Sequence, residues 1–428
     1  MGARRRYLGR PMVRAPPKGQ VQERVPVHPL AKAQTAVRRP QFRSSLGVLL
    51  VLGLAACGVR APDPTLNQPP PSAVTVPTPV EPQRTQVGLV VPMSGQAAEV
   101  GRALQDAAEL ALFDLNAPDI ELLPADAGTS AATATGAVQN ILVGGADVVI
   151  GPLGATSVKA AAPAARARGL TVLGFSTDRS AGGGGVYLMG FMPEEQVSTV
   201  VSHAADAGLK RFGALIPLGA YGEVVGSAFE VAVGSHGGAV AGVERYKSGS
   251  LQPTESLKAL LAPGPDGRPQ VDALFVPEGG AALAQVTSVL AGLGFDSRAV
   301  RLLGTDQWSG SNLGSDPLTL GGWYAGPSPD RFERFASHFQ GAYGHRPPRI
   351  AAQAYDAVTL AVLLSRQAGG FADAARVLTA PDGFAGVDGL FRFRADGVPQ
   401  HGLAILEVTA SGPQVIRPAP ETFTGQGF

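Results

Sequence analysis

Short apolar runs alternate along the chain with longer segments in which apolar residues recur every three or four positions. Residues 87–91 form the first such run and stop at Pro92, and a segment with helical spacing follows them up to Leu115. Runs of this length predict buried strands, and the spacing of the longer segments predicts amphipathic helices. Other strands expected in the same way fall at residues 120–123, 147–151, 170–173 and 212–216, near Val240, and at 272–276 and 300–303.

The expected fold class is α/β, with two doubly wound parallel-sheet lobes. Strands that are apolar throughout are covered by helices on both faces, which is typical of parallel sheets. The alternation restarts near residue 193, and two runs of similar length predict two lobes rather than one oversized sheet. Two helical segments, at about residues 329–343 and 350–367, and two short strands, at 390–393 and 403–408, are expected to close the chain.

The chain before residue 87 has a different character. A short apolar run, residues 44–57, follows eleven Lys or Arg residues and ends at Cys57, the single cysteine. The residues before Cys57 resemble the bacterial lipobox, and with the basic flank they predict a lipoprotein signal peptide over residues 1–57, with Cys57 lipidated and the protein exported. The run is shorter than the about 20 apolar residues that span a membrane. Residues 58–86 hold eight prolines and predict an extended tether.

Removal of the signal peptide would change the charge of the protein. The segment before Cys57 carries 11 of the 35 basic residues and one of the 34 acidic residues, so the remainder has a net charge of −9. Nucleic acid and anionic lipid surfaces require basic patches, so we expect no nucleic acid partner and membrane contact through the lipid anchor alone. Gly58 follows the cysteine where a retention signal would have aspartate, which favours the outer membrane over the inner one.

Residues that could carry catalysis or bind a metal are few. The histidines after Cys57 are scattered without paired spacing, and no thiol remains once Cys57 is acylated. The four glycines at residues 182–185 lack the lysine of a phosphate loop. Ser94 lacks the Gly-x-Ser-x-Gly setting of a hydrolase nucleophile. We therefore expect a protein that is not an enzyme and that needs no metal or cofactor.

Four motifs in order resemble those of type I periplasmic binding proteins. They are residues 91–95 (VPMSG) followed by Gly101, residues 150–153 (IGPL), residues 221–222 (YG) and residues 354–358 (AYDAV). The resemblance covers residues 86–408 and implies an interlobe cleft. It also implies three passages of the chain between the lobes, near residues 192–196, 326–331 and 386–389. Lobe 1 would then comprise residues 87–192 and 327–386, and lobe 2 residues 193–326 and 387–410, before a tail at 411–428.

Within that superfamily the chain resembles penicillin-binding protein activators of the LpoA type. Residues 151–155 (GPLGA), 174–178 (GFSTD) and 303–308 (LGTDQW) carry this resemblance. It implies a lipoprotein that regulates peptidoglycan synthesis by contacting a penicillin-binding protein, which is a peptidoglycan synthase. The longest activators carry a helical-repeat domain before this fold, and the proline-rich segment has no such pattern, so a mechanism that needs the extra domain is not implied.

The cleft residues that the resemblance implies lie in loops after predicted strands. Hydroxyl and free N–H groups near a helix start can hold a carboxylate, and a buried acid can receive an ammonium group. The same residue types are common in turns and helix caps, so the pattern does not by itself require a ligand. The ligand-binding candidates are Ser94, Gly95, Thr156, Ser157 and Ser176 from lobe 1 and Tyr221, Glu278 and Asp306 from lobe 2.

Two functions are compatible with these features. The first is a non-enzymatic envelope lipoprotein that regulates peptidoglycan synthesis through protein contacts. The alternative is the substrate-binding lipoprotein of an ABC importer for amino acids or related small solutes. The two differ in the cleft, because an importer component needs a pocket that closes on its ligand. Trp308, Trp323 and Tyr324 are compatible with either a partner surface or a core.

Overall fold

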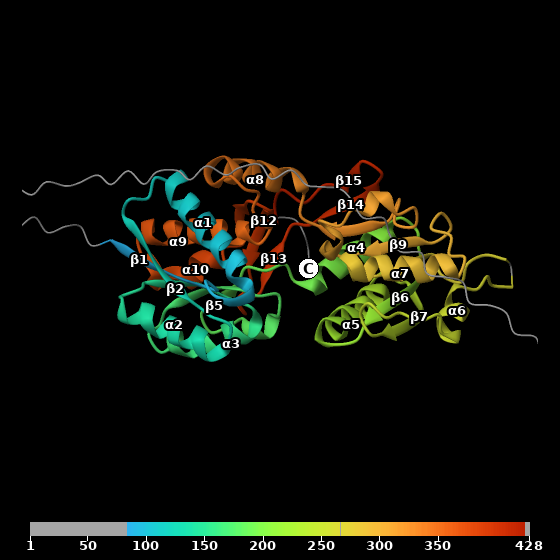
Figure 1. Ribbon diagram of the computed structural model, residues 1–428, viewed down its shortest axis with the longest axis horizontal. Helices are drawn as coiled ribbons and strands as arrows, with labels where there is room; N and C mark the ends of the chain where they lie inside the picture. Colours follow the sequence, from blue (N-terminus) through green and yellow to red (C-terminus); the bar gives the residue numbers. More distant parts are fainter. Residues whose placement is uncertain (1–83, 266, 424–428) are drawn as a thin grey trace, which may run out of the picture. The chain divides into compact units, whose positions relative to one another are not determined.

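The computed structural model describes residues 84–265 and 267–423, and these residues form two α/β lobes (Figure 1). The predicted signal peptide, Cys57 and residues 58–83 of the predicted tether lie outside the described residues. The tether was expected to extend to residue 86, but Thr85 and Gln86 already belong to strand β1 (Thr85–Val91). Within the described part of the chain, no helix is long and apolar enough to cross a membrane. The expected α/β fold class with two parallel-sheet lobes is confirmed.

Lobe 1 is built on a parallel sheet with the strand order β2-β1-β3-β4-β5. Val87, Leu89 and Val91 of β1 pack in one core cluster and Val90 packs in another. The strand is apolar throughout because helices cover both faces of the sheet. The strands are β1 (Thr85–Val91), β2 (Ile120–Asp126), β3 (Val148–Leu153), β4 (Thr171–Phe175) and β5 (Val186–Leu188).

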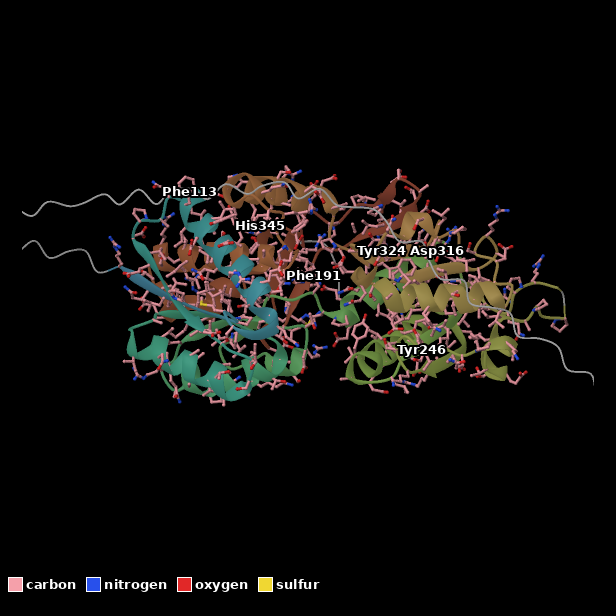
Figure 2. The ribbon with its side chains drawn as sticks, in the orientation of Figure 1. Phe113, Phe191, Tyr246, Asp316, Tyr324 and His345 are labelled. Atoms are coloured by element: carbon pink, nitrogen blue, oxygen red, sulfur yellow. The ribbon has the colours of Figure 1, made fainter. Side chains whose placement is uncertain are left out.

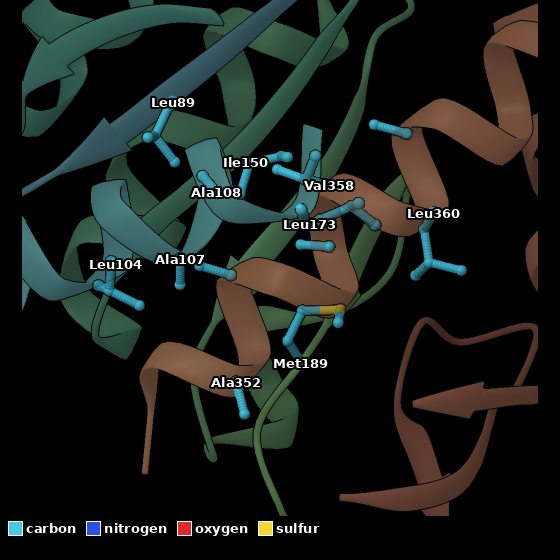
Figure 3. Packing of buried hydrophobic residues seen from close by; sticks show 14 of the residues in the cluster. Leu89, Leu104, Ala107, Ala108, Ile150, Leu173, Met189, Ala352, Val358 and Leu360 are labelled. Atoms are coloured by element: carbon cyan, nitrogen blue, oxygen red, sulfur yellow. The ribbon is translucent and has the colours of Figure 1, made fainter. Parts of the chain in front are cut away.

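The helices of lobe 1 divide between the two faces of its sheet. One face carries α1 (Ala98–Asp114), α8 (Pro329–Tyr343), α9 (Ala351–Arg366) and α10 (Ala374–Leu378), and the other carries α2 (Ala131–Val143) and α3 (Ala155–Arg166). Figure 3 shows the first face, where alanines of α1 and α9 meet beside the leucine and isoleucine side chains of the sheet. Small side chains let these helices pack closely, which explains the alanine-rich sequence of both.

Lobe 2 is built on a sheet with the order β15-β14-β10-β9-β8-β6-β7. Its strands are parallel from β10 to β7, and β14 and β15 are antiparallel additions. The strands are β6 (Arg211–Pro217), β7 (Ala239–Tyr246), β8 (Ala273–Phe275), β9 (Arg301–Gly304), β10 (Trp323–Gly326), β14 (Ala404–Thr409) and β15 (Gly412–Arg417). Helices α4 (Pro193–Asp206) and α5 (Ala220–Ser235) cover one face, and α6 (Glu255–Leu261) and α7 (Gly280–Gly292) cover the other.

The two sheets share one strand order. Taken in chain order, β1 to β5 of lobe 1 and β6 to β10 of lobe 2 both follow the pattern 2-1-3-4-5. In this arrangement the connections leave the first and third strands toward opposite faces, which opens a crevice at their carboxyl ends. Each lobe therefore has one such crevice, which we call its switch point. It lies between β1 and β3 in lobe 1 and between β6 and β8 in lobe 2.

The chain passes between the lobes after β5, after β10 and after a small antiparallel sheet formed by β11 (Phe384–Gly386), β12 (Gly389–Phe393) and β13 (Pro399–His401). Phe391 and Phe393 of β12 are buried in the core of lobe 1. The third passage therefore lies at Gly402, between β13 and β14, and its expected place at residues 386–389 is wrong.

The end of the chain also differs from expectation. Residues 411–428 were expected to form a tail, but β15 pairs with β14 along the edge of the lobe 2 sheet. None of its six residues is buried, which fits a strand at the edge of the sheet. β5 and β10 were not expected either. Each has only three or four residues, although Val186, Tyr187 and Leu188 of β5 are apolar and buried.

Candidate functional site

The switch point of lobe 1 gathers the loop after β1, which carries Ser94 and Gly95, and the start of α3, which carries Thr156 and Ser157. Helix α3 begins after Gly154, whose φ of 87° is in the region that favours glycine. Ser157 is half-buried and Thr156 is exposed. In the described residues neither hydroxyl has a hydrogen-bond partner, and no side chain caps the helix. Free N–H groups and two hydroxyls at a helix start suit an anionic group.

Ser94 is engaged within lobe 1. Asp126, at the end of β2, accepts hydrogen bonds from the backbone N–H groups of Met93 and Gly128, both at 2.8 Å. The Ser94 hydroxyl also bonds this carboxylate and is the main reason why the pKa of Asp126 lies below its ordinary value. Gly95 has a φ of 74°, which fits the glycine there. Ser94 and Gly95 therefore fix the conformation of the loop after β1. The negative charge beside this loop belongs to Asp126, which was not among the candidates from the sequence.

Ser176 is 5% exposed and accepts a hydrogen bond from the backbone N–H of Asp178 at 3.1 Å. Asp178 pairs with Lys159 of α3 at 2.6 Å, and that hydrogen bond is the main cause of its lowered pKa. This contact ties the loop after β4 to α3. Ser176 thus supports the wall of the switch point and keeps only its own O–H proton for another partner.

The switch point of lobe 2 brings together the start of α5 and the loop after β8. Glu278, in that loop, is 8% exposed and accepts a hydrogen bond from the hydroxyl of Tyr246, which is labelled in Figure 2. Burial is the main reason why the pKa of Tyr246 is raised, so the phenol keeps its proton and donates it. The bond occupies Oε2 of Glu278, and no donor of the described residues reaches Oε1. Glu278 is therefore an anchored acid with an acceptor left for a cation.

Tyr221 is held inside lobe 2. Its hydroxyl lies 3.1 Å from the carbonyl oxygen of Pro277 and 3.2 Å from the hydroxyl of Thr305. Burial raises the pKa of Tyr221 to about 12, so the phenol is neutral. These contacts join α5 to the loops after β8 and β9. The hydroxyl is largely committed, and Tyr221 offers a ligand its ring rather than a free donor.

Asp306 is tied to α4. Its backbone N–H donates to Oε1 of Gln196 at 2.8 Å, and its carboxyl accepts a hydrogen bond from the Ser309 hydroxyl at 2.5 Å. Burial raises its pKa to about 6, and the positive charge of Arg349 opposes this shift. Asp306 therefore fixes the loop after β9 against the helix that follows the first passage between the lobes. Its carboxyl group accepts from a neighbouring serine, whereas that of Glu278 accepts from a tyrosine on another strand.

The aromatic residues after β9 and in β10 belong to the interior. Trp308 is 1% exposed and donates from Nε1 to the carbonyl oxygen of Val276 at 3.0 Å, and Tyr324 is 2% exposed. Trp323 is half-buried and donates to Glu407 at 3.0 Å. Of the two alternatives for these residues, the structure supports the core.

One glycine in each lobe lets a helix pack directly against the backbone at the end of the first strand. A Cβ added at Gly101 of α1 would overlap the carbonyl oxygen of Pro92, and one added at Gly222 of α5 would overlap that of Pro217. Pro92 follows β1 and Pro217 ends β6, so each lobe seats the first turns of its helix against the end of its first strand in the same way. The likeness of the two lobes therefore extends to the close approach beside the candidate site.

In the described residues no group of three or more His, Cys, Asp or Glu side chains could hold a metal ion. The three larger hollows of the described residues are not lined by the ligand-binding candidates. One of about 630 Å³ runs between α4 and α5, one of about 600 Å³ lies between β2 and α2 and is lined in part by Asp126, and one of about 500 Å³ lies between the loop after β9 and the start of α8. The candidate sites are therefore located by the strand ends and the polar groups beside them, and not by a large hollow.

Two α/β lobes, each with polar groups at its switch point, are the architecture of a binding protein that holds its ligand with both lobes. The chain belongs to the periplasmic binding protein family, whose pattern matches residues 84–413. Membership implies export to the periplasm and solute binding rather than catalysis. None of the curated proteins matches the chain.

Solved structures share the fold. A protein assigned to a branched-chain amino acid ABC transporter of Rhodospirillum rubrum is 21% identical, with a TM-score of 0.69 over 78% of this chain and 100% of its own. A solute-binding protein of Rhodopseudomonas palustris in complex with 3,4-dihydroxybenzoic acid is 19% identical, with a TM-score of 0.59 over 79% and 97%. A branched-chain amino acid binding protein of Streptococcus pneumoniae in complex with isoleucine is 19% identical, with a TM-score of 0.56 over 78% and 100%.

At these identities the likeness concerns the fold. None of the three structures is a penicillin-binding protein activator, so the closer resemblance to activators has no support from them. The wider resemblance to type I periplasmic binding proteins is confirmed.

Proposed function

We propose that this chain is the solute-binding protein of an ABC importer and that its ligand is a small zwitterion such as an amino acid. One observation carries the proposal. The open polar groups of the two switch points are of opposite kind, with free donors at the start of α3 in lobe 1 and the anchored carboxylate of Glu278 in lobe 2. A molecule with a carboxylate and an ammonium group would satisfy both.

The charges around these groups favour the same ligand. Lys159 of α3, the cation nearest these groups in sequence, is neutralised by Asp178 at 2.6 Å. The anion-binding capacity of lobe 1 therefore comes from backbone N–H groups and from the hydroxyls of Thr156 and Ser157. Such groups hold one carboxylate without attracting a strongly charged anion.

The related structures add support, because they include binding proteins in complex with isoleucine and with 3,4-dihydroxybenzoic acid. Those ligands belong to those proteins. For this chain they indicate that the fold can accommodate a small carboxylate as ligand. The activator function that the sequence motifs implied draws no support from any contact described above.

Thermal unfolding with a panel of amino acids, benzoate and peptidoglycan fragments tests the proposal. A ligand at about 100 times its Kd stabilises the folded state by about 2.7 kcal/mol. We expect a clear rise in Tm with at least one amino acid, and Glu278→Gln to weaken that binding by about tenfold or more, since it removes the charge opposite the ammonium group. Glu223→Gln is the control, because Glu223 pairs with Arg245 at the lobe surface.

A panel without any Tm change, together with capture of a penicillin-binding protein by this chain, would favour the activator function instead. An equal loss of affinity in Glu278→Gln and Glu223→Gln would contradict the role of Glu278.

The lipid anchor is a separate proposal. We infer that Cys57 is acylated after export and that residues 58–83 hold the binding lobes away from the membrane. Expression with a radiolabelled fatty acid should label the natural chain and leave Cys57→Ser unlabelled. Separation of inner and outer membranes would then test the expected outer-membrane location.

A further inference from the structure

A polar hollow of about 340 Å³ lies beside the segments that pass between the lobes. We call it the crossover pocket. It is lined by Arg179 and Arg394 from lobe 1, by Glu194 of α4, by His401 of β13 and by Arg417 at the end of β15. None of the open groups of the candidate site, Thr156, Ser157 or Glu278, lines it. The crossover pocket is therefore distinct from the switch points.

The arginines that line the crossover pocket have N–H donors without a close hydrogen-bond acceptor among the described residues. Arg179 lies 3.8 Å from Glu194 and 3.7 Å from Asp396, and Arg417 lies 3.8 Å from Asp206. These distances exceed those of hydrogen bonds, so the pairs are loose. Arg394 is exposed, and in the described residues its side chain has neither an ion pair nor a hydrogen bond. Guanidinium groups with unused donors suit a carboxylate or a phosphate group.

Two buried polar atoms of residues that line the pocket have no hydrogen-bond partner among the described residues. They are Nδ1 of His401 and Oε2 of Glu194. The His401 side chain is 9% exposed, and its ring lies against Phe191, labelled in Figure 2, with the ring centroids 4.1 Å apart. Nδ1 is 3.8 Å from Glu195, whose carboxylate already accepts the backbone N–H of His401 at 3.0 Å. Buried polar atoms without partners are costly, which points to a group that completes them.

The acids around the pocket restrict the class of ligand. Glu194 and Glu195 line it, and Asp206 and Asp396 face two of its arginines. A bare anion would meet these carboxylates as well as the guanidinium groups. A molecule that also carries hydroxyl groups could donate to Oε2 of Glu194 while its anionic group bonds Arg394 and Arg417. A volume of about 340 Å³ is at the lower end of the range for small-molecule pockets, which suits such a small molecule.

We propose that the crossover pocket binds a small hydroxylated anion, with its carboxylate or phosphate group on Arg394 and Arg417 and a hydroxyl group on Glu194. Residues of both lobes contribute, so the bound anion joins Arg394 of lobe 1 to Arg417 of lobe 2. It would thereby resist relative movement of the lobes at the place where the chain passes between them.

Isothermal titration of the purified protein with citrate, glycerol 3-phosphate and inorganic phosphate tests this proposal, with sodium chloride at the same ionic strength as reference. We expect citrate or glycerol 3-phosphate to bind and the other two salts to bind more weakly. Citrate as the tighter of the two identifies the anionic group as carboxylate, and glycerol 3-phosphate identifies it as phosphate. Arg394→Gln and Arg417→Gln should each weaken binding by about tenfold or more.

Arg168→Gln is the matched control, because Arg168 is an exposed arginine at the end of α3, outside the pocket. It should bind as the natural protein does. The proposal is overturned if neither hydroxylated anion binds more tightly than chloride, or if Arg168→Gln weakens binding as much as Arg394→Gln does. Inorganic phosphate binding as tightly as glycerol 3-phosphate would overturn the role of the hydroxyl group. None of these outcomes depends on whether the switch points bind an amino acid.

Discussion

The hydroxyl of Tyr246, at the end of β7, donates a hydrogen bond to Glu278 in the loop after β8. β7 and β8 are not neighbours, because β6 lies between them in the sheet. The bond therefore reaches across the end of β6, beside the switch point of lobe 2. It fixes the carboxyl group of Glu278 in place.

Removal of this hydroxyl should weaken ligand binding without removing the acid. In Tyr246→Phe the carboxylate of Glu278 loses its donor and gains freedom to move, so we expect a several-fold rise in Kd for the amino acid, smaller than that of Glu278→Gln. Titration calorimetry measures both. Tyr343→Phe is the control, since that hydroxyl donates to the carbonyl oxygen of Asp106 in lobe 1. A rise in Kd in the control as large as in Tyr246→Phe would count against a specific effect.

Gly101→Ala and Gly222→Ala should each destabilise the protein. The added Cβ would overlap the carbonyl oxygen of Pro92 or of Pro217, and overpacking of this kind costs about 1–3 kcal/mol. Gly136→Ala in α2 is the matched control, because a Cβ there meets nothing within 4 Å and a helical alanine is favoured by about 0.5–1 kcal/mol. Urea unfolding checks the three variants. Equal stability of Gly101→Ala and Gly136→Ala would disprove the close approach.

Asp356 should make stability depend on pH. Its carboxyl is buried, and burial raises its pKa from the ordinary 3.8 to about 8. The folded protein therefore keeps a proton that the unfolded chain releases above about pH 4, so this group's contribution to stability falls as pH rises from about 4 and levels off above about 8. Asparagine cannot ionise, so the stability of Asp356→Asn should fall less between about pH 4 and pH 8 than that of the natural protein.

The measurement for Asp356 is the urea midpoint at pH 5 and at pH 8. The difference between the two values should shrink in Asp356→Asn. Asp382→Asn, at an exposed position, should keep the difference of the natural protein. A difference unchanged in Asp356→Asn would show that this carboxyl does not carry the effect.

Trp308→Phe should destabilise lobe 2. The phenyl ring cannot donate to the carbonyl oxygen of Val276, and a buried acceptor left without its donor costs about 1–3 kcal/mol. Phe113→Ala, at a side chain that is 81% exposed, should change stability by no more than about 0.5 kcal/mol. Chemical denaturation of both variants tests this, and a Trp308→Phe protein as stable as the natural one would contradict the role of the indole N–H.

Most of the fold could be predicted because it follows from local patterns. The strand at residues 87–91 is apolar at every position, so helices had to cover both of its faces. β15 was not predicted because it lacks a run of buried apolar residues, and only its pairing with β14 identifies it as a strand. The third passage was misplaced because nothing local shows that Phe391 and Phe393 are buried in lobe 1.

The candidate site, like the fold, could be predicted only in part from the sequence. Topology brings Thr156, Ser157 and Glu278 to the switch points, as their positions after strands suggested. The sequence did not reveal that Asp126 would engage Ser94, that Tyr221 would be held by Pro277 and Thr305, or that Asp306 would be tied to Gln196. These are contacts between residues far apart in the chain, and no local pattern encodes them.

By itself, the sequence determined the α/β class, the two lobes and the strand ends from which a binding site is built, because hydrophobic periodicity and strand–helix alternation are properties of neighbouring residues. The tertiary structure alone decided which polar groups at those strand ends are satisfied and which remain open. That depends on distances across the sheet and between the lobes, as the bond between Tyr246 and Glu278 illustrates, and such distances exist only once the chain has folded.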